Sequence, residues 1–188
     1  MGYGIERDEA IALLKKFIKN ENLIRHCLAS EAVMIELAKK FGEDEDKWGL
    51  AGLLHDLDVE LVNADLSVHT LETEKILREN HVDEEIIDAI KMHNEMASKK
   101  KRSEKFHHAL AAAETITGLV VATALVYPDK KLASVKSKSI RKRMKQKAFA
   151  AGVNRENIME CEKIGLDLNE FCEIALTAMR GIADELGL

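Results

Sequence analysis

Histidines and carboxylates provide the groups in this sequence that could bind a divalent metal ion. His26 lies midway along an amphipathic segment, and the adjacent pair His55 and Asp56 ends an apolar one. Glu114 stands in a third segment that is otherwise apolar apart from threonines and one glycine. Two imidazoles and two carboxylates form a set of nitrogen and oxygen donors, which suits Fe, Mn, Zn, Co or Mg rather than soft copper. Because neighbouring residues on a helix diverge by about 100°, His55 and Asp56 can reach one ion only where their helix ends.

The surroundings of Glu114 also allow a purely structural interpretation. A carboxylate in an apolar helix cannot stay ionised without a partner, so it must meet a cation or hydrogen-bond donors, or take up a proton. Ala111, Thr117 and Gly118 place small side chains on the same helix face and leave a concavity that ligands from other helices could fill. Nearby hydroxyls or a lysine could equally satisfy the carboxylate. Glu114 alone therefore does not decide between the two interpretations.

Motifs of several common enzyme classes are absent from the sequence. It contains no His-Glu-x-x-His, no Gly-x-Ser-x-Gly, no Gly-x-x-x-x-Gly-Lys-Ser/Thr and no Gly-x-Gly-x-x-Gly. Zincin proteases, nucleophile-elbow hydrolases, P-loop enzymes and dinucleotide-binding enzymes are therefore excluded. The three cysteines, Cys27, Cys161 and Cys172, form no Cys-x-x-Cys pair, so neither a disulfide framework nor a thiolate zinc site is indicated.

The composition predicts one helical domain. A chain of 188 residues is long enough for one packed core and short for two. Hydrophobic residues make up 46% and aromatic residues 4%, with Pro128 as the single proline, so a β-sandwich with many turns is disfavoured. The net charge of -5 argues against a protein that coats nucleic acid through its whole surface. Residues 1–8 have no basic stretch before an apolar one, so we expect a cytoplasmic protein.

Helical spacing of apolar residues predicts the elements that must position these groups. The predicted helices cover residues 10–18, with Asp8 as the cap, and about 22–41, 44–55, 71–79, 84–92 and 109–127, followed by a basic helix near 135–150, one after Asn154 and one opened by Asp167. Residues 97–105, which carry four consecutive cations, are predicted to form a solvated surface loop. Residues 109–127 approach the length of a membrane span, but the charge at Glu114 and the lack of a second apolar span favour a helix buried by protein.

The order of these residues resembles the HD-domain superfamily of metal-dependent phosphohydrolases. The family has a His on one helix, a His-Asp pair ending a later helix and a distal acid, and positions 49–56 here read Gly-Leu-Ala-Gly-Leu-Leu-His-Asp. The resemblance extends from about residue 23 to 118. Segment 147–155 and the chain length are similar to a group of small bacterial HD proteins of uncharacterised function. The resemblance implies one all-α, HD-like helical bundle over residues 1–188, with a core of about 22–128 and additional C-terminal helices at about 135–188.

The resemblance also implies roles for particular residues. By their place in the family's motif, the metal ligands would be His26, His55, Asp56 and Glu114, and the catalytic residues would be Asp56, His69 and His93. Family members that bind two metal ions, or that hold phosphate with histidines, use additional histidines at the positions that His69 and His93 match. The family's distal ligand is an aspartate, so the extra methylene of Glu114 would move its carboxylate by about 1.5 Å.

The chemistry implied is the hydrolysis of a phosphate ester. A divalent ion (Mn, Fe, Co, Ni, Zn or Mg) would lower the pKa of a bound water for attack on phosphorus. The substrate would be a nucleotide or another small phosphate ester. His107 lies about 10.5 Å along the helix from Glu114, too far to share an ion, and is assigned to a substrate phosphate. No membrane partner is expected, nucleic acid is disfavoured, and a homo-oligomer is compatible with the sequence.

Two interpretations from other classes stay open. A non-catalytic HD module would bind a metal and a phosphorylated ligand without hydrolysing it, and the change at Glu114 favours this interpretation. A structural helical protein would use apolar faces to dimerise, and its histidines would be incidental. Metal content separates the structural protein from the other two.

The sequence also contains a strongly basic stretch. Residues 130–147 hold nine cations and no acid in a chain that is acidic elsewhere. The simplest interpretation is a solvated helix face, since no aromatic residue interleaves the cations to stack on bases. The functional interpretation is that part of the stretch folds over the cavity mouth and attracts phosphorylated substrate.

Overall fold

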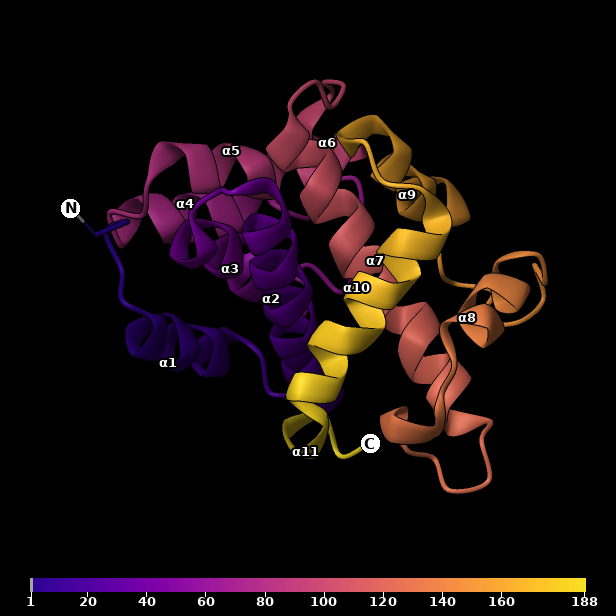
Figure 1. Cartoon of the computed structure of the whole chain (residues 1–188). Coiled ribbons are helices and arrows are strands. Elements are labelled where there is room, and N and C mark those ends of the chain that lie inside the picture. The colour runs from indigo at the N-terminus through magenta and orange to yellow at the C-terminus, as the bar shows by residue number, and fades with distance from the viewer. Residues whose placement is uncertain (1) are drawn as a thin grey trace.

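The computed structural model describes residues 2–188, and within that range the chain is entirely helical, with eleven α-helices, two 3-10 helices and no strand (Figure 1). The predicted all-α fold is therefore confirmed. In chain order the elements are α1 (Arg7–Phe17), α2 (Glu21–Phe41), α3 (Glu45–Leu54), α4 (Leu71–Glu79), α5 (Glu84–His93), α6 (Glu95–Ser98), α7 (Lys105–Leu125), η1 (Leu132–Ser134), α8 (Ser137–Met144), α9 (Arg155–Met159), η2 (Glu160–Ile164), α10 (Leu168–Gly181) and α11 (Ala183–Leu186).

Local capping signals explain most helix boundaries. The side chain of Asn20 accepts a hydrogen bond from the backbone at the start of α2, and Gly42 ends that helix with a φ of 69°. Asp167 caps α10 as expected. The expected cap of the first helix is wrong, because Asp8 lies in the first turn of α1 and Glu6 is the cap. Glu6 and Glu9 form a reciprocal capping box, which local acid content alone does not distinguish from a cap at Asp8.

Helix α7 forms the centre of the bundle. It packs against α2, α5, α9 and α10, and Figure 1 shows it passing between the N-terminal helices and the C-terminal ones. The helix is long and apolar enough to cross a membrane, but 72% of its most apolar 18-residue window is buried inside the protein. This burial is the pattern of a central helix, so the expectation that protein covers residues 109–127 is confirmed.

Helices α2 and α3 approach each other closely at Gly52. A Cβ atom at this position would lie 2.7 Å from the carbonyl oxygen of Ser30 and 2.8 Å from the backbone nitrogen of Glu31. Only glycine tolerates such an approach without a backbone shift. Since Gly52 precedes His55 by three residues and Ser30 follows His26 by four, this contact brings the two histidines of the motif to the same level of the bundle.

The loop between α3 and α4 is fixed by Asp58. Its carboxylate accepts hydrogen bonds from the backbone nitrogens of Thr70, Glu72 and Thr73, at 2.8, 3.1 and 3.1 Å. The backbone nitrogen of Asp58 in turn donates to the Thr73 hydroxyl at 3.1 Å. Because a buried carboxylate satisfies the free N–H groups at the start of α4, the start of this helix is held beside the end of α3.

Candidate metal centre

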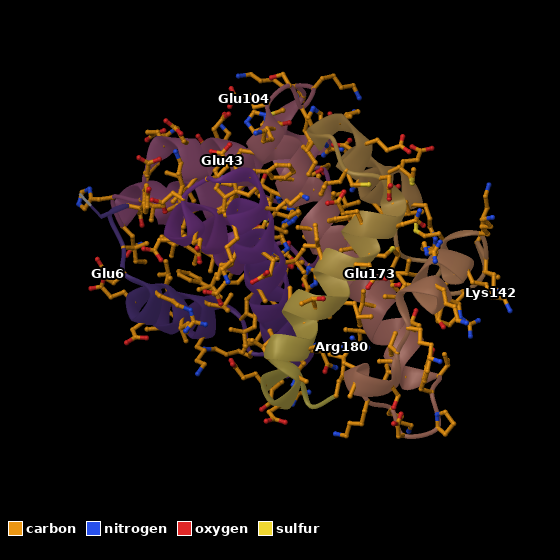
Figure 2. All side chains as sticks on the ribbon, in the orientation of Figure 1. Glu6, Glu43, Glu104, Lys142, Glu173 and Arg180 are labelled. Carbon is orange, nitrogen blue, oxygen red and sulfur yellow. The ribbon has the colours of Figure 1, made fainter. Side chains whose placement is uncertain are left out.

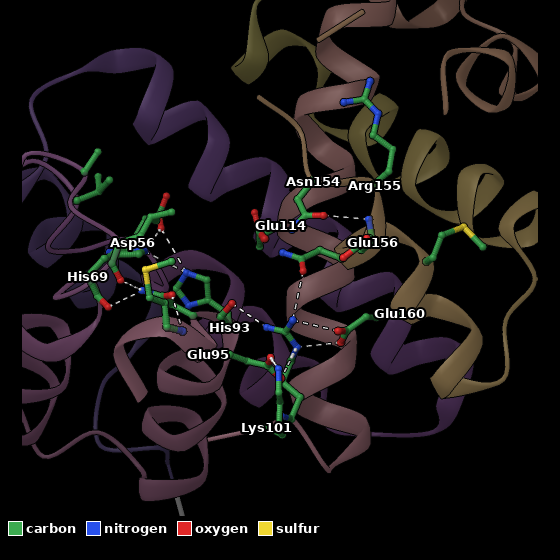
Figure 3. A pocket seen from close by; sticks show the side chains of 18 of the residues that line it. Asp56, His69, His93, Glu95, Lys101, Glu114, Asn154, Arg155, Glu156 and Glu160 are labelled. Atoms are coloured by element: carbon green, nitrogen blue, oxygen red, sulfur yellow. Dashed lines mark hydrogen bonds and ion pairs between the residues drawn. The ribbon is translucent and has the colours of Figure 1, made fainter. Parts of the chain in front are cut away.

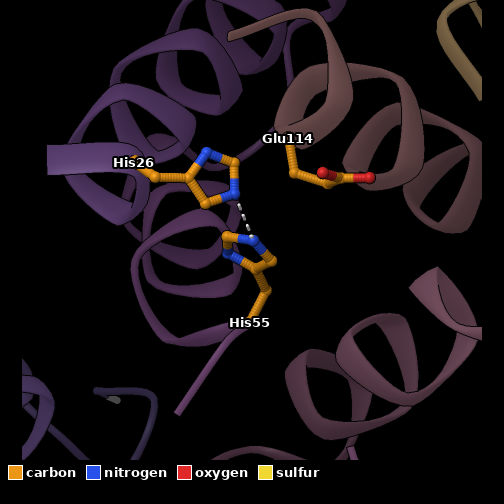
Figure 4. Close-up of side chains that lie close together, drawn as sticks. All are labelled: His26, His55 and Glu114. Atoms are coloured by element: carbon orange, nitrogen blue, oxygen red, sulfur yellow. Dashed lines mark hydrogen bonds between the residues drawn. The ribbon is translucent and has the colours of Figure 1, made fainter. Parts of the chain in front are cut away.

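The imidazoles of His26 and His55 face each other across the contact between α2 and α3. Their Nε2 atoms lie 3.1 Å apart (Figure 4). Nδ1 of His55 donates to the carbonyl oxygen of Gly52 at 2.8 Å. Nδ1 of His26 donates to the Thr117 hydroxyl at 2.9 Å, because that hydroxyl uses its own proton on the carbonyl oxygen of Glu114 at 2.6 Å. The neutral form of each ring is therefore assigned the Nδ1–H tautomer, in which its Nε2 atom is a bare acceptor.

His69 and His93 form a second pair with the same arrangement. Their Nε2 atoms are also 3.1 Å apart. Nδ1 of His93 donates to the carbonyl oxygen of Ile90 at 2.6 Å, and Nδ1 of His69 donates to the Asp58 carboxylate at 2.7 Å. Partners of this kind on the far ring nitrogen orient metal-ligating histidines and make them more basic. The carboxylate of Asp58 therefore both builds the loop and aims His69.

Asp56 lies between the two histidine pairs. One carboxylate oxygen is 3.1 Å from Nε2 of His69, 3.4 Å from that of His55 and 3.7 Å from that of His93. The other oxygen is 3.6 Å from Nε2 of His26. Helix α3 ends at Leu54, so Asp56 lies outside the regular helix and its side chain can reach the same site as that of His55. A single carboxylate thus contacts all four imidazoles.

Glu114 comes from the central helix and joins the pair formed by His26 and His55. One of its carboxylate oxygens and the two imidazole nitrogens all lie within 4.8 Å of one another. The same limit holds for a second group made of Asp56, His69 and His93. The Thr115 hydroxyl donates to the carboxylate of Glu114. The structure therefore brings together all six residues assigned to the metal and to catalysis, from α2, the end of α3, the following loop, α5 and α7.

Burial and neighbouring charges set the proton affinities of these groups in the metal-free chain. Burial, together with neighbouring imidazoles, lowers the pKa of His26 to about 4 and that of His93 to about 3. For His69, burial alone would lower the pKa, but the hydrogen bonds to Asp56 and Asp58 outweigh it and raise the pKa to about 9. Burial raises the pKa of Glu114 to about 8, and the negative charge of Asp56 acts in the same direction.

The donor set fits a divalent metal ion. Two bare Nε2 atoms 3.1 Å apart cannot form a hydrogen bond with each other, so each histidine pair needs a proton or a metal cation between or beside its nitrogens. At neutral pH the metal-free chain supplies that proton at His69, but burial disfavours one on His26. Nitrogen and carboxylate donors suit Zn, Fe, Mn, Co or Ni. The residues present could therefore hold one ion at each of the two groups.

A cavity of about 1090 Å³ opens over this cluster (Figure 3). Asp56, His69, His93 and Glu114 are among the residues that line it. Its other walls come from the loop before α4, from the segment around α6, and from residues 154–163, the side chains of which are shown across the cavity from His93. A volume of this size accommodates a ligand as large as a nucleotide.

Two features of the sequence that were assigned to this cavity lie elsewhere. His107 is buried and its Nε2 contacts the Asp88 carboxylate at 2.9 Å, with Glu104 nearby, and none of the three lines the cavity. Its assignment to a substrate phosphate therefore has no structural support. Likewise no residue of the basic stretch 130–147 lines the cavity. Lys142 of α8 projects away from the body of the protein in Figure 2, which agrees with the solvated helix face and not with the alternative in which this stretch covers the mouth.

Other residues of the site were missed in the sequence. Asp58 follows Asp56 by two positions and lies in the same loop, a signal that was present but is common in turns. In the sequence, Thr117 is prominent only as a small side chain on the helix face of Glu114. Arg102, expected in a solvated loop, has a side chain only 7% exposed. Each depends on a partner distant in sequence, which local patterns do not identify.

Comparison with known proteins identifies one family. The family model described as HD domain matches residues 23–125, more than half of the chain and all six clustered residues. No curated protein and no solved structure matches the chain significantly.

Proposed function

This chain belongs to the HD-domain family, and from that premise we propose that it is a metal-dependent phosphohydrolase acting on a nucleotide or another small phosphate ester. One observation carries the proposal: two histidine pairs, each with Nε2 atoms 3.1 Å apart, converge on a single carboxylate that lines a large cavity. An arrangement needed only for packing would not leave the two acceptors of His26 and His55 facing each other.

The proposed ligands divide into two groups. His26, His55 and Glu114 would hold one ion, and His69, His93 and Asp56 would hold the other, with Asp56 in contact with both groups. A divalent ion lowers the pKa of a coordinated water and offsets charge on phosphoryl oxygens. The remaining work falls to the protein, which must orient the donors and bind the rest of the ester.

The buried partners of the histidines would orient these donors. The carbonyl oxygens of Gly52 and Ile90, the Thr117 hydroxyl and the Asp58 carboxylate fix all four rings in the orientation that directs Nε2 inward. In the metal-free chain His69 holds a proton on the side of Asp56, and that proton must leave when a metal binds. Two lysines also line the cavity, each beside an acid: Lys101 lies 2.7 Å from Glu95 and Lys163 lies 3.6 Å from Glu160.

One observation favours a second candidate, a module that binds a metal and a phosphorylated ligand without hydrolysis. The pKa of Glu114 is raised to about 8 by burial, so this carboxylate competes poorly as a ligand unless a cation draws off its proton. Where an aspartate is the family's usual acid, this side chain is also longer. Turnover therefore decides between the two candidates, and metal content alone does not.

The experiment combines metal analysis with an activity screen. Protein purified without chelator should retain about one or two divalent ions per chain, and His55→Ala or Asp56→Ala should remove most of them. His81→Asn is the matched control, since His81 is exposed and its φ of 58° suits asparagine. Release of phosphate from nucleotides and simple esters with Mn²⁺, Co²⁺ or Zn²⁺ would support the enzyme. Metal binding without turnover would favour the binding module, and wild type that neither retains nor rebinds metal would refute both.

A further inference from the structure

One wall of the cavity is built from residues outside the segment that matches the HD family. The match ends at residue 125, whereas Asn154, Glu156, Met159 and Lys163 also line the cavity. Figure 3 shows Asn154 and Glu156 across the cavity from His69. Asn154 caps α9, and the other three residues belong to α9 and η2, which both pack against α7. The proposed metal ligands all lie within residues 23–125. Residues 154–163 are therefore not required for metal binding, and their side chains can instead determine which esters the site accepts.

Arg102 fastens this wall to the segment that carries His93. Its Nη1 donates to the carbonyl oxygens of Met92 and His93, at 3.1 and 2.9 Å. Its Nε and Nη2 donate to the two carboxylate oxygens of Glu160, at 2.9 and 3.0 Å, and Nη2 also donates to Asn157 at 3.2 Å. A single guanidinium therefore joins the end of α5 to both α9 and η2.

The fastening is buried and specific to arginine. The side chain of Arg102 is 7% exposed and that of Glu160 is 10% exposed. Nδ1 of His108 adds a third contact to Glu160 at 2.7 Å. A lysine would retain the charge but would lack the planar fork that makes five contacts at once. Removing one partner of such a pair would leave the other buried without compensation.

The cavity also has apolar lining residues. Leu66, from the loop before α4, is 55% exposed, and Met96 of α6 is 61% exposed, and both line the cavity together with Val59 and Ala64. Single exposed apolar residues need no explanation. Here, however, several of them line one cavity together with charged and amide side chains. A ligand that fits such a lining has an apolar face and polar edges.

We infer that the cavity contains a leaving-group subsite, formed between the apolar residues Leu66 and Met96 and the wall of residues 154–163, which selects esters whose leaving group has an apolar face. Arg102 is the positioning residue that holds the wall in place. The inference rests on the proposed function, because it places the phosphoryl group at the histidine cluster. Binding and turnover are separable, so it can fail independently of that function.

The first test measures whether Arg102 holds residues 154–163 in place. Arg102→Lys is compared with Arg180→Lys, because Arg180 of α10 likewise donates to backbone carbonyls, those of Leu132, Ala133 and Val135, but lines no part of the cavity. In Arg102→Lys, amide hydrogen exchange in residues 154–163 should accelerate at least about tenfold. In Arg180→Lys it should stay at the wild-type rate. If Arg102→Lys does not fold, Glu160→Gln provides the same comparison, since the amide leaves one carboxylate contact unmade.

The second test measures ligand selection without requiring turnover. Equilibrium binding of 1-naphthyl phosphate and of glycerol 3-phosphate is measured in the presence of Mn²⁺, by fluorescence for the first and by competition for the second. Wild type should bind the naphthyl ester about tenfold more tightly or better. Met96→Ser and Arg102→Lys should reduce this ratio several-fold. Leu61→Ser should preserve it, since Leu61 is 52% exposed but does not line the cavity.

The outcomes separate the two proposals. Equal affinity of wild type for the two esters, or an unchanged ratio in both Met96→Ser and Arg102→Lys, would overturn the subsite. Unchanged exchange in residues 154–163 of Arg102→Lys would overturn the positioning role. Selective binding without phosphate release would leave the subsite in place and reject hydrolysis.

Discussion

Nε2 of His26 and Nε2 of His55 lie 3.1 Å apart although the two residues come from different helices. With Nδ1–H of each ring donating to a neighbouring oxygen, neither Nε2 atom has a proton to donate to the other. The close approach of α2 and α3 at Gly52 imposes this contact, and a cation would relieve it. The fold therefore holds two hydrogen-bond acceptors close together, and this arrangement is favourable only when a cation binds to them.

Removal of a residue that orients a ligating histidine should weaken metal binding without removing a ligand. Asp58→Asn is expected to lower metal affinity about 10- to 100-fold, because the amide cannot accept from Nδ1 of His69 and from three backbone nitrogens as strongly as the carboxylate does. Titration with Co²⁺ or Zn²⁺ measures the affinity. Asp65→Asn is a suitable control in the same loop, because Asp65 is exposed and contacts only Ser67 through its side chain. Equal affinity in wild type and Asp58→Asn would contradict the orienting role.

Metal should stabilise the folded chain through the proposed ligands. A ligand that binds only the native state raises the melting temperature, and the shift shrinks when a donor is removed. Wild type should therefore show a metal-induced rise in melting temperature, and His26→Ala should show a clearly smaller one. Thermal unfolding with and without Mn²⁺, Co²⁺ or Zn²⁺ gives the comparison. Identical shifts would exclude His26 as a ligand.

Glu114 should make the metal-free protein less stable as the pH rises. Its pKa in the folded chain is about 8, above the ordinary value of 4.5, so between these values the native state holds a proton that the unfolded state has released. Stability from this group is therefore full below about pH 4.5 and is lost as the pH rises through 8. Urea unfolding in chelator should show that Glu114→Gln, which cannot ionise, gains stability relative to wild type from pH 5 to pH 8. The opposite trend, or a constant difference, would show that the carboxylate is already ionised in the fold.

The sequence predicted the fold and the histidine motif because both depend on local patterns. Helical spacing and capping residues placed α2, α4 and α5 to within about two residues, and the His-Asp pair lies where α3 ends. Arg102 was missed because its neighbours are three lysines, and only the distant Glu160 makes its burial favourable. His107 shares a helix face with Glu114, but its Nε2 atom is hydrogen-bonded to the carboxylate of Asp88 in α5. Such competition between partners far apart in sequence leaves no periodic signal.

The contact at Gly52 should be more sensitive than a glycine one helical turn earlier. In Gly52→Ala the new Cβ would meet backbone atoms of Ser30 and Glu31 at 2.7 and 2.8 Å, so α2 and α3 must separate. In Gly49→Ala the nearest atom is the flexible side chain of Ile35 at 3.0 Å, which can move. Alanine favours a helix over glycine by about 1 kcal/mol in both variants, so this effect cancels in the comparison.

We therefore expect Gly52→Ala to lose about 1–3 kcal/mol of unfolding free energy relative to Gly49→Ala, as overpacked cores do. Denaturant unfolding measures this difference. Because the separation also moves His55 away from His26, metal affinity should fall in Gly52→Ala and stay near that of wild type in Gly49→Ala. A Gly52→Ala protein that is destabilised but binds metal normally would show that the helix contact stabilises the fold without setting the distance between the two histidines.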